Sequence, residues 1–221
     1  MKPMGHVLLL LLVTVSARAA DFQEGVHYQR LPVPVETKDA NRVEVVELFS
    51  YACIHCKTFD PTLEAWRGEQ ADDVLFRRVP AIFNQTWKLL AQAFYAAEVL
   101  GIGEKVHQPM FRALHDQGVN LGNPSLLAAL FQEVAGVVPS EFTQVFNSFS
   151  VRSRVQQAEA HGRAYRVTGV PTLIVDGIYR IDGKMAGNNT KMLEIVDFLI
   201  AERRGAANAD RTEAISASKG Q

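Results

Sequence analysis

Two cysteines, the only ones in the 221-residue chain, lie three positions apart in the tetrapeptide Cys53-Ile54-His55-Cys56. A disulfide that closes so short a loop adds little stability, which argues against a purely structural bridge. A zinc site would need about four ligands, so a metal interpretation of Cys53, His55 and Cys56 requires a distant ligand. A redox-active dithiol needs no other residue and no bound cofactor or metal. This spacing therefore favours thiol–disulfide chemistry.

The surroundings predicted for the two sulfurs are unequal. Exchange proceeds by attack of a thiolate on a disulfide, so it depends on which sulfur ionises and which is accessible. We expect Cys53 at the start of a helix, where free backbone N–H groups and the helix dipole favour an anion. His55 adds a positive charge when protonated; its alternative interpretation is an exposed helix residue without a role. Both effects would make the disulfide an oxidant, with Cys56 as the buried resolving thiol.

A carboxylate and a proline are further candidates for the site. Glu47 interrupts an apolar strand six residues before Cys53. If it is buried beneath the dithiol, its pKa is raised and it suits proton handling for a buried thiol; the alternative is a strand-edge residue that faces water. Val170-Pro171 opens a later strand. A trans turn proline is the simpler expectation, whereas a cis bond would free the Val170 backbone to pair with an extended substrate.

The elements that must position these residues follow from the apolar patterns. Four segments are expected to be strands because they are rich in apolar and β-branched residues: 43–49, 74–79, 170–175 and 178–181. The segments with a helical period are 57–66, 87–100, 104–115, 124–136, one that begins at Pro139, 151–166 and 188–203. The last two strands meet at Asp176-Gly177, a strong hairpin signal. The order is a βαβ unit and a ββα unit separated by a helical block, in which His107 and His115 are expected to have structural or surface roles.

The two ends of the chain are set apart from this fold. Lys2, the apolar run 7–15 and Ala17-Arg18-Ala19 are typical of a cleavable signal peptide over residues 1–19. The run is too short to span a bilayer, although an uncleaved anchor is the alternative. Export would deliver the chain to a compartment where disulfides persist. Residues 204–221 are small and polar without periodicity, and we expect a disordered tail.

The overall composition is that of an ordinary globular protein. Hydrophobic residues make up 48% of the chain and charged residues 21%, with a formal net charge of −1. This balance gives no indication of nucleic acid binding or of an electrostatically bound membrane surface. No obvious interface helix stands out, and we expect a monomer.

Taken together, these motifs resemble the thioredoxin superfamily, and within it the DsbA family of periplasmic disulfide-forming oxidoreductases. The residues that carry the resemblance are Glu47-Leu48-Phe49-Ser50-Tyr51-Ala52-Cys53-Ile54-His55-Cys56 and Gly169-Val170-Pro171-Thr172, with the helical insertion between them and the export signal ahead. It covers residues 21 to about 203. The resemblance implies an α/β, thioredoxin-like fold with an inserted all-helical domain. The thioredoxin-like domain would then consist of residues 20–83 and 167–203, and the insertion of residues 84–166.

The resemblance also implies roles for single residues. Cys53 would be the attacking cysteine, Cys56 the buried one, Pro171 cis with Val170 before it, and Glu47 the family's buried acid. The implied partners are unfolded exported proteins and a membrane DsbB-like, quinone-linked oxidase in the periplasm. This chain departs from the family at Ile54, where most members carry proline, which leaves the oxidising strength open.

The activity that these features favour is donation of the Cys53–Cys56 disulfide to newly exported proteins through a mixed disulfide at Cys53. One alternative is a disulfide isomerase or reductant. The short stretch ahead of the first expected strand leaves no room for the N-terminal dimerisation region that exported isomerases carry. A second alternative is a thioredoxin-like chaperone or binding module in which the dithiol has no redox role.

Overall fold

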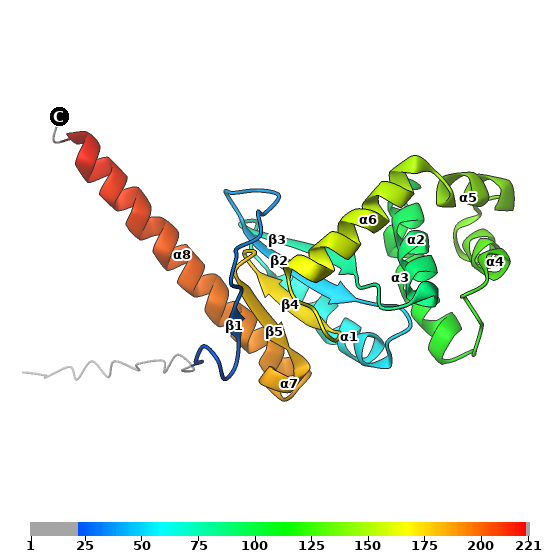
Figure 1. Cartoon of the computed structure of the whole chain (residues 1–221), viewed down its shortest axis with the longest axis horizontal. Coiled ribbons are helices and arrows are strands. Elements are labelled where there is room, and N and C mark those ends of the chain that lie inside the picture. The colour runs from blue at the N-terminus through cyan, green and yellow to red at the C-terminus, as the bar shows by residue number, and fades with distance from the viewer. Residues whose placement is uncertain (1–21, 220–221) are drawn as a thin grey trace, which may run out of the picture.

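The computed structural model describes residues 22–219 and is built on one mixed sheet (Figure 1). Its strands are β1 (Gln29–Arg30), β2 (Val43–Phe49), β3 (Val74–Pro80), β4 (Thr172–Val175) and β5 (Tyr179–Asp182). They are arranged in the order β1-β5-β4-β2-β3. Only β2 and β3 pair in parallel, as expected for strands joined by a helix, and the other neighbours are antiparallel.

Eight helices accompany these strands in the described residues. They are α1 (Ile54–Glu69), α2 (Gln85–Val99), α3 (Gly103–His115), α4 (Pro124–Ala135), α5 (Pro139–Phe146), α6 (Phe149–Ala164), α7 (Gly183–Ala186) and α8 (Asn189–Lys219). Helices α2 to α6 follow one another between β3 and β4, and most of them gather at one end of the sheet (Figure 1). The predicted βαβ unit, helical insertion and ββα unit are confirmed. None of the helices in residues 22–219 has the length and apolar character needed to cross a bilayer.

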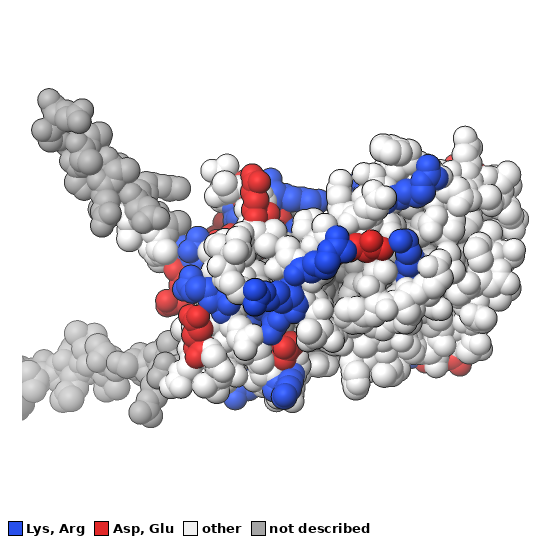
Figure 2. Space-filling model, in the orientation of Figure 1, with Lys and Arg blue, Asp and Glu red and all other residues white. Residues whose placement is uncertain are grey.

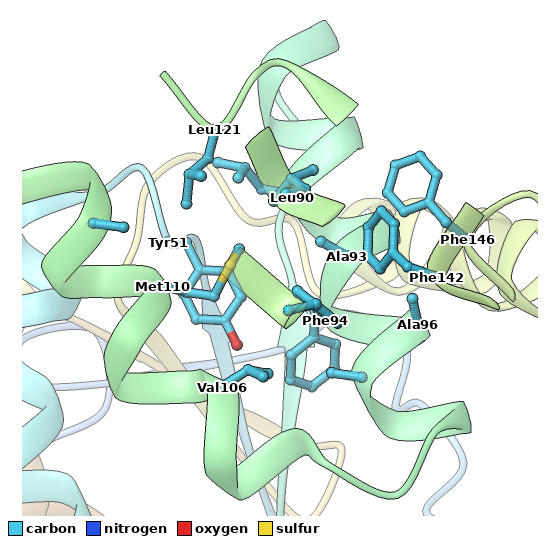
Figure 3. Packing of buried hydrophobic residues seen from close by; sticks show 14 of the residues in the cluster. Tyr51, Leu90, Ala93, Phe94, Ala96, Val106, Met110, Leu121, Phe142 and Phe146 are labelled. Atoms are coloured by element: carbon cyan, nitrogen blue, oxygen red, sulfur yellow. The ribbon is translucent and has the colours of Figure 1, made fainter. Parts of the chain in front are cut away.

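Both faces of the sheet are covered, so the interior strand β2 is buried on both sides. In β2, Val45 packs with residues of α1 and α8, whereas Val46 and Leu48 pack with residues of α6. This alternation follows from the two-residue period of a strand. The end of β2 continues into a third core, in which Phe49 joins apolar side chains of the insertion. Figure 3 shows part of this core, including Leu90, Phe94 and Met110. The strand that precedes the dithiol is therefore fixed from three directions.

The sheet register brings the two predicted site segments together. Leu48 pairs with Thr172 in the antiparallel pair of β2 and β4. The chain that leaves β2 toward Cys53 and the chain that enters β4 from Val170 must therefore lie at the same end of the sheet. In the parallel pair, Glu47 pairs with Arg78. Segments more than a hundred residues apart in the sequence thus form one site.

Some elements differ from the sequence-based expectations. Strand β1 lies in a segment for which no element was predicted, and it forms because Gln29 pairs with Arg180 of β5, a contact that no local pattern reveals. The short helix α7 was also not predicted; it begins where the Asp182 side chain accepts hydrogen bonds from two backbone N–H groups.

The end of the chain is also different. Helix α8 continues to Lys219 and extends away from the body, where we predicted a helix ending at residue 203 and a disordered tail (Figure 1). That segment is rich in alanine and charged residues with high helix propensity, and the single Gly205 costs only about 1 kcal/mol. The predicted signal peptide, residues 1–19, lies outside the described residues.

The predicted hairpin turn is present and provides a test of the fold. Both Asp176 and Gly177 have positive φ, +52° and +63°, and the Gly177 carbonyl accepts a hydrogen bond from the Val35 N–H. A Cβ on Gly177 would lie 1.9 Å from the Val35 backbone oxygen. We expect Gly177→Ala to lower the free energy of unfolding by at least about 2 kcal/mol, from strain and the clash together, in a chemical denaturation experiment.

Gly136 is the matched control for this substitution. It also has a positive φ, +71°, but nothing lies within 4 Å of an added Cβ. Gly136→Ala should therefore show the backbone strain alone and lose about 1 kcal/mol. Equal losses for the two variants would contradict the close approach of residue 35 to the hairpin.

Candidate active site

Cys53 occupies the N-cap position of α1, directly after the turn that leaves β2. Its backbone is extended, with φ −93° and ψ 116°, and its N–H donates to the Ser50 carbonyl oxygen at 3.0 Å. The Lys57 N–H donates to the Cys53 carbonyl oxygen at 3.1 Å, which closes the first turn of the helix. The sulfur therefore lies beside the free N–H groups of a helix start, as the sequence predicted.

The two cysteines are free thiols with opposite environments. Cys53 is half-buried, and its pKa is lowered to about 6 by a hydrogen bond from the Cys56 thiol, then by the backbone N–H groups of Cys56 and His55 and by the charge of His55. Cys56 is completely buried. Burial, the bond to Cys53 and the nearby Glu47 carboxylate raise the pKa of Cys56 far above its ordinary range. One sulfur is accessible and easily ionised, and the other is neither.

The segment before β4 approaches the accessible sulfur. The Val170–Pro171 peptide bond is cis, the isomer that the family resemblance implied. The Cys53 thiol donates to the Val170 carbonyl oxygen over 3.4 Å. A cavity of about 480 Å³ adjoins this contact, and His55, Val170 and Pro171 are among its lining residues. The exposed Ile54 lies beside the same dithiol, with 49% of its surface accessible.

Glu47 lies inside the molecule rather than at a wet strand edge, since only 1% of its surface is exposed. Arg78 donates from Nε to the Glu47 carboxylate at 2.8 Å. Burial raises the pKa of Glu47 to about 7. The charge and the hydrogen bond of Arg78 lower this pKa, whereas the Asp60 and Glu64 carboxylates raise it further. A carboxyl group with this pKa exchanges its proton near neutral pH.

Four residues connected with Glu47 were not among the predicted site residues. Arg78 also donates from Nη2 to Asp60 at 2.9 Å, and Asp60 in turn contacts the His107 ring at 2.9 Å. The other ring nitrogen of His107 lies 3.0 Å from the Tyr51 hydroxyl. One signal was available, because arginine breaks the apolar segment 74–79 at the position that pairs with Glu47. The contact of His107 with Asp60 of α1 depends on tertiary packing and had no such signal.

The three predicted site segments thus come together, with Glu47 beneath the dithiol and Val170-Pro171 beside it. Within residues 22–219 there is no group of three or more His, Cys, Asp or Glu side chains arranged to hold a metal ion.

Comparisons with known proteins show similarity over most of the chain. The model of a family described as DSBA-like thioredoxin domain matches residues 68–197. The thiol:disulfide interchange protein DsbA of Azotobacter vinelandii is 38% identical over 86% of this chain and 89% of that protein. The DsbA of Pseudomonas aeruginosa is 37% identical over 89% of this chain and 92% of its own length.

Solved structures give the same relationship in three dimensions. The crystal structure of Pseudomonas aeruginosa DsbA superposes with a TM-score of 0.82 at 37% identity and covers 86% of this chain and 98% of that one. The oxidoreductase DsbA of Xylella fastidiosa gives a TM-score of 0.76 at 36% identity over 81% of this chain and 96% of that one. With its inserted helices and its paired thiols, the chain has the thioredoxin-like fold, belongs to the DSBA-like thioredoxin domain family and is a protein disulfide oxidoreductase.

Proposed function

We propose that this protein is a dithiol oxidase that donates its Cys53–Cys56 disulfide to reduced, newly exported proteins. The observation that carries the proposal is the contrast between the two sulfurs. Cys53 is partly accessible with a pKa lowered to about 6, whereas Cys56 is buried with a raised pKa. A dithiol in which one thiolate is stabilised favours its reduced form, so its disulfide is an oxidant.

The reaction takes place in two exchange steps. A substrate thiolate attacks Cys53 Sγ, because this sulfur is the accessible one, and the Cys53–Cys56 bond breaks as the mixed disulfide forms. The electron pair of that bond leaves on Cys56. A second substrate thiolate then attacks the substrate sulfur of the mixed disulfide and releases Cys53 as a thiolate. Its low pKa makes Cys53 a good leaving group, and the substrate gains a disulfide while the protein becomes a dithiol.

Glu47 is proposed to supply the proton that the first step requires. Cys56 leaves as an anion in a buried site where burial disfavours the charged form. Glu47 is close enough for its charge to raise the pKa of Cys56, and its own pKa of about 7 leaves it partly protonated at neutral pH. Protonated Glu47 gives up a proton as Cys56 accepts one, and the reverse transfer accompanies re-oxidation.

Val170 and His55 are proposed to line the approach of the substrate chain. The Val170 carbonyl oxygen already faces the Cys53 sulfur, and an extended peptide could pair with this backbone in the manner of an added strand. The cavity beside Pro171 would receive a substrate side chain. The likeness to proteins named DsbA supports the remaining expectations, which are a periplasmic location after removal of residues 1–19, a DsbB-like membrane oxidase as electron acceptor and no cofactor beyond the disulfide.

A redox titration against glutathione, combined with oxidation of a reduced unfolded protein, tests this proposal. We expect the equilibrium to favour the reduced dithiol strongly and the oxidised protein to introduce disulfides stoichiometrically. A dithiol as reducing as that of thioredoxin would contradict an oxidase and favour the reductant. Prevention of aggregation without any disulfide transfer would favour the chaperone instead.

A further inference from the structure

Helix α3 of the insertion lies along the redox helix α1 and contacts it through polar side chains at three levels. Near the start of α1, Lys57 forms an ion pair with Asp116. In the middle, Asp60 of α1 contacts His107 of α3 at 2.9 Å. Toward the end of α1, Arg67 pairs with Glu104 at 3.2 Å. Helix α3 is therefore positioned to affect where α1 begins.

Two histidines of α3 reach beyond α1 to the turn that presents Cys53. His115 Nε2 lies 2.7 Å from the backbone carbonyl oxygen of Tyr51, two residues before Cys53. His107 Nδ1 lies 3.0 Å from the Tyr51 hydroxyl. Both ends of Tyr51 are thus held by one helix of the insertion.

The Tyr51 side chain has no freedom to leave this arrangement. It is 2% exposed and packs into the insertion core beside Phe94, Val106 and Met110, as Figure 3 shows. Its ring also makes an edge-on contact with Phe49, the last residue of β2. A buried hydroxyl needs a hydrogen-bond partner, and His107 supplies it.

We propose that His107 and His115 are positioning residues for the dithiol, through which the helical insertion fixes the turn that carries Cys53 at the start of α1. This inference rests on the proposed role of Cys53 as the attacking cysteine. The Cys53 thiolate is stabilised by the Cys56 thiol and by the backbone N–H groups of Cys56 and His55, which donate to its sulfur. Displacement of the turn would weaken these directed hydrogen bonds. The insertion would then help to set the oxidising strength as well as cover the site.

The test compares His115→Leu, which removes the donor to the Tyr51 carbonyl, with His115→Gln, whose amide N–H can replace it. The pKa of Cys53 is measured from thiolate absorbance, and the redox equilibrium constant is measured against glutathione. For His115→Leu we expect a raised pKa of Cys53 and a fall of about threefold in the constant for reduction, which corresponds to part of one hydrogen bond. For His115→Gln both quantities should stay near those of the wild type.

A second variant and a control keep the test decisive if His115→Leu folds poorly. Tyr51→Phe removes only the hydroxyl that contacts His107 and should shift the same two quantities in the same direction. His161→Leu alters a half-buried histidine of α6 that stacks on Tyr165, and it should leave them unchanged.

Loss of stability in His115→Leu and Tyr51→Phe with an unaltered pKa of Cys53 would overturn the inference, and so would equal effects of His115→Gln and His115→Leu. Failure of the proposed function would look different. Wild-type protein would then not oxidise a reduced substrate, whatever the histidine variants do to the thiolate.

Discussion

Replacing Cys53 with serine is expected to reduce oxidation of an unfolded, reduced protein to the uncatalysed background. The reason is that Cys56 is completely buried and its pKa is strongly raised, so it can neither receive a substrate thiolate nor act alone. Cys56→Ser should behave differently, because the accessible sulfur remains. Incubated with a disulfide-containing peptide, it should accumulate a mixed disulfide at Cys53 that intact-mass spectrometry detects.

The two serine variants serve as controls for each other, since each removes one sulfur atom and both are expected to fold. Far-UV circular dichroism should show the same helix content for both. Adducts that form equally well in Cys53→Ser and in Cys56→Ser would contradict the assigned order of attack. Retained oxidase activity in Cys53→Ser would contradict the proposed mechanism altogether.

Glu47→Gln is expected to make the protein more stable at alkaline pH while leaving its stability near pH 4.5 almost unchanged. Burial raises the pKa of Glu47 from 4.5 to about 7, so the fold favours the protonated carboxyl. The stabilisation of the folded state by protonated Glu47 is fully present below pH 4.5 and is lost as the pH rises through 7. Above this range the ionised carboxylate destabilises the protein by roughly 3 kcal/mol, which a glutamine avoids. Denaturant unfolding of the oxidised protein at pH 4.5 and pH 8 measures the difference.

Glu44 provides the matched control on the same strand. It is as deeply buried as Glu47 but pairs with Arg77 at 3.0 Å on the face covered by α6, away from the dithiol. Glu47→Gln should also slow the first exchange step at neutral pH, because Cys56 loses the proton donor proposed for it, whereas Glu44→Gln should not. A stability difference between Glu47→Gln and the wild type that does not change with pH would show that Glu47 does not titrate in this range.

Local patterns were sufficient to predict the elements that hold the dithiol. The β-branched segment 43–49 forms a strand with the predicted bounds, and Asn123-Pro124 and Gly136 mark the ends of α4 as their cap preferences indicate. The turn at Asp176-Gly177 was equally clear because few residues adopt positive φ. These features are encoded within a few neighbouring residues, which is why the sequence alone reveals them.

The remaining parts of the site depend on contacts between distant segments. The largest contribution to the low pKa of Cys53 comes from the Cys56 thiol, whereas only the helix start and His55 could be expected from the sequence. The contacts of His107 and His115 with Tyr51 require the packing of α3 against the end of β2. No periodicity in the helical block distinguishes these two histidines from residues on any other buried face.

Charged side chains are unevenly distributed between the thioredoxin-like part of the molecule and the helical insertion. Figure 2 shows that charged side chains on this face gather over the sheet and α6, while the end formed by the insertion is largely uncharged. The insertion also carries the exposed apolar side chains Leu126, Val138 and Phe149, which suits the proposed contact with unfolded chains.

The most direct test is a titration of the Cys53 thiolate in the reduced protein, followed by its ultraviolet absorbance, with Cys56→Ala to identify the sulfur and to remove the Cys56 donor. We expect a midpoint near pH 6 in the wild type and a higher midpoint in Cys56→Ala, because alanine cannot donate the hydrogen bond that contributes most to the stability of the Cys53 thiolate. A wild-type midpoint near 9.0, the ordinary value for a cysteine thiol, would contradict this expectation.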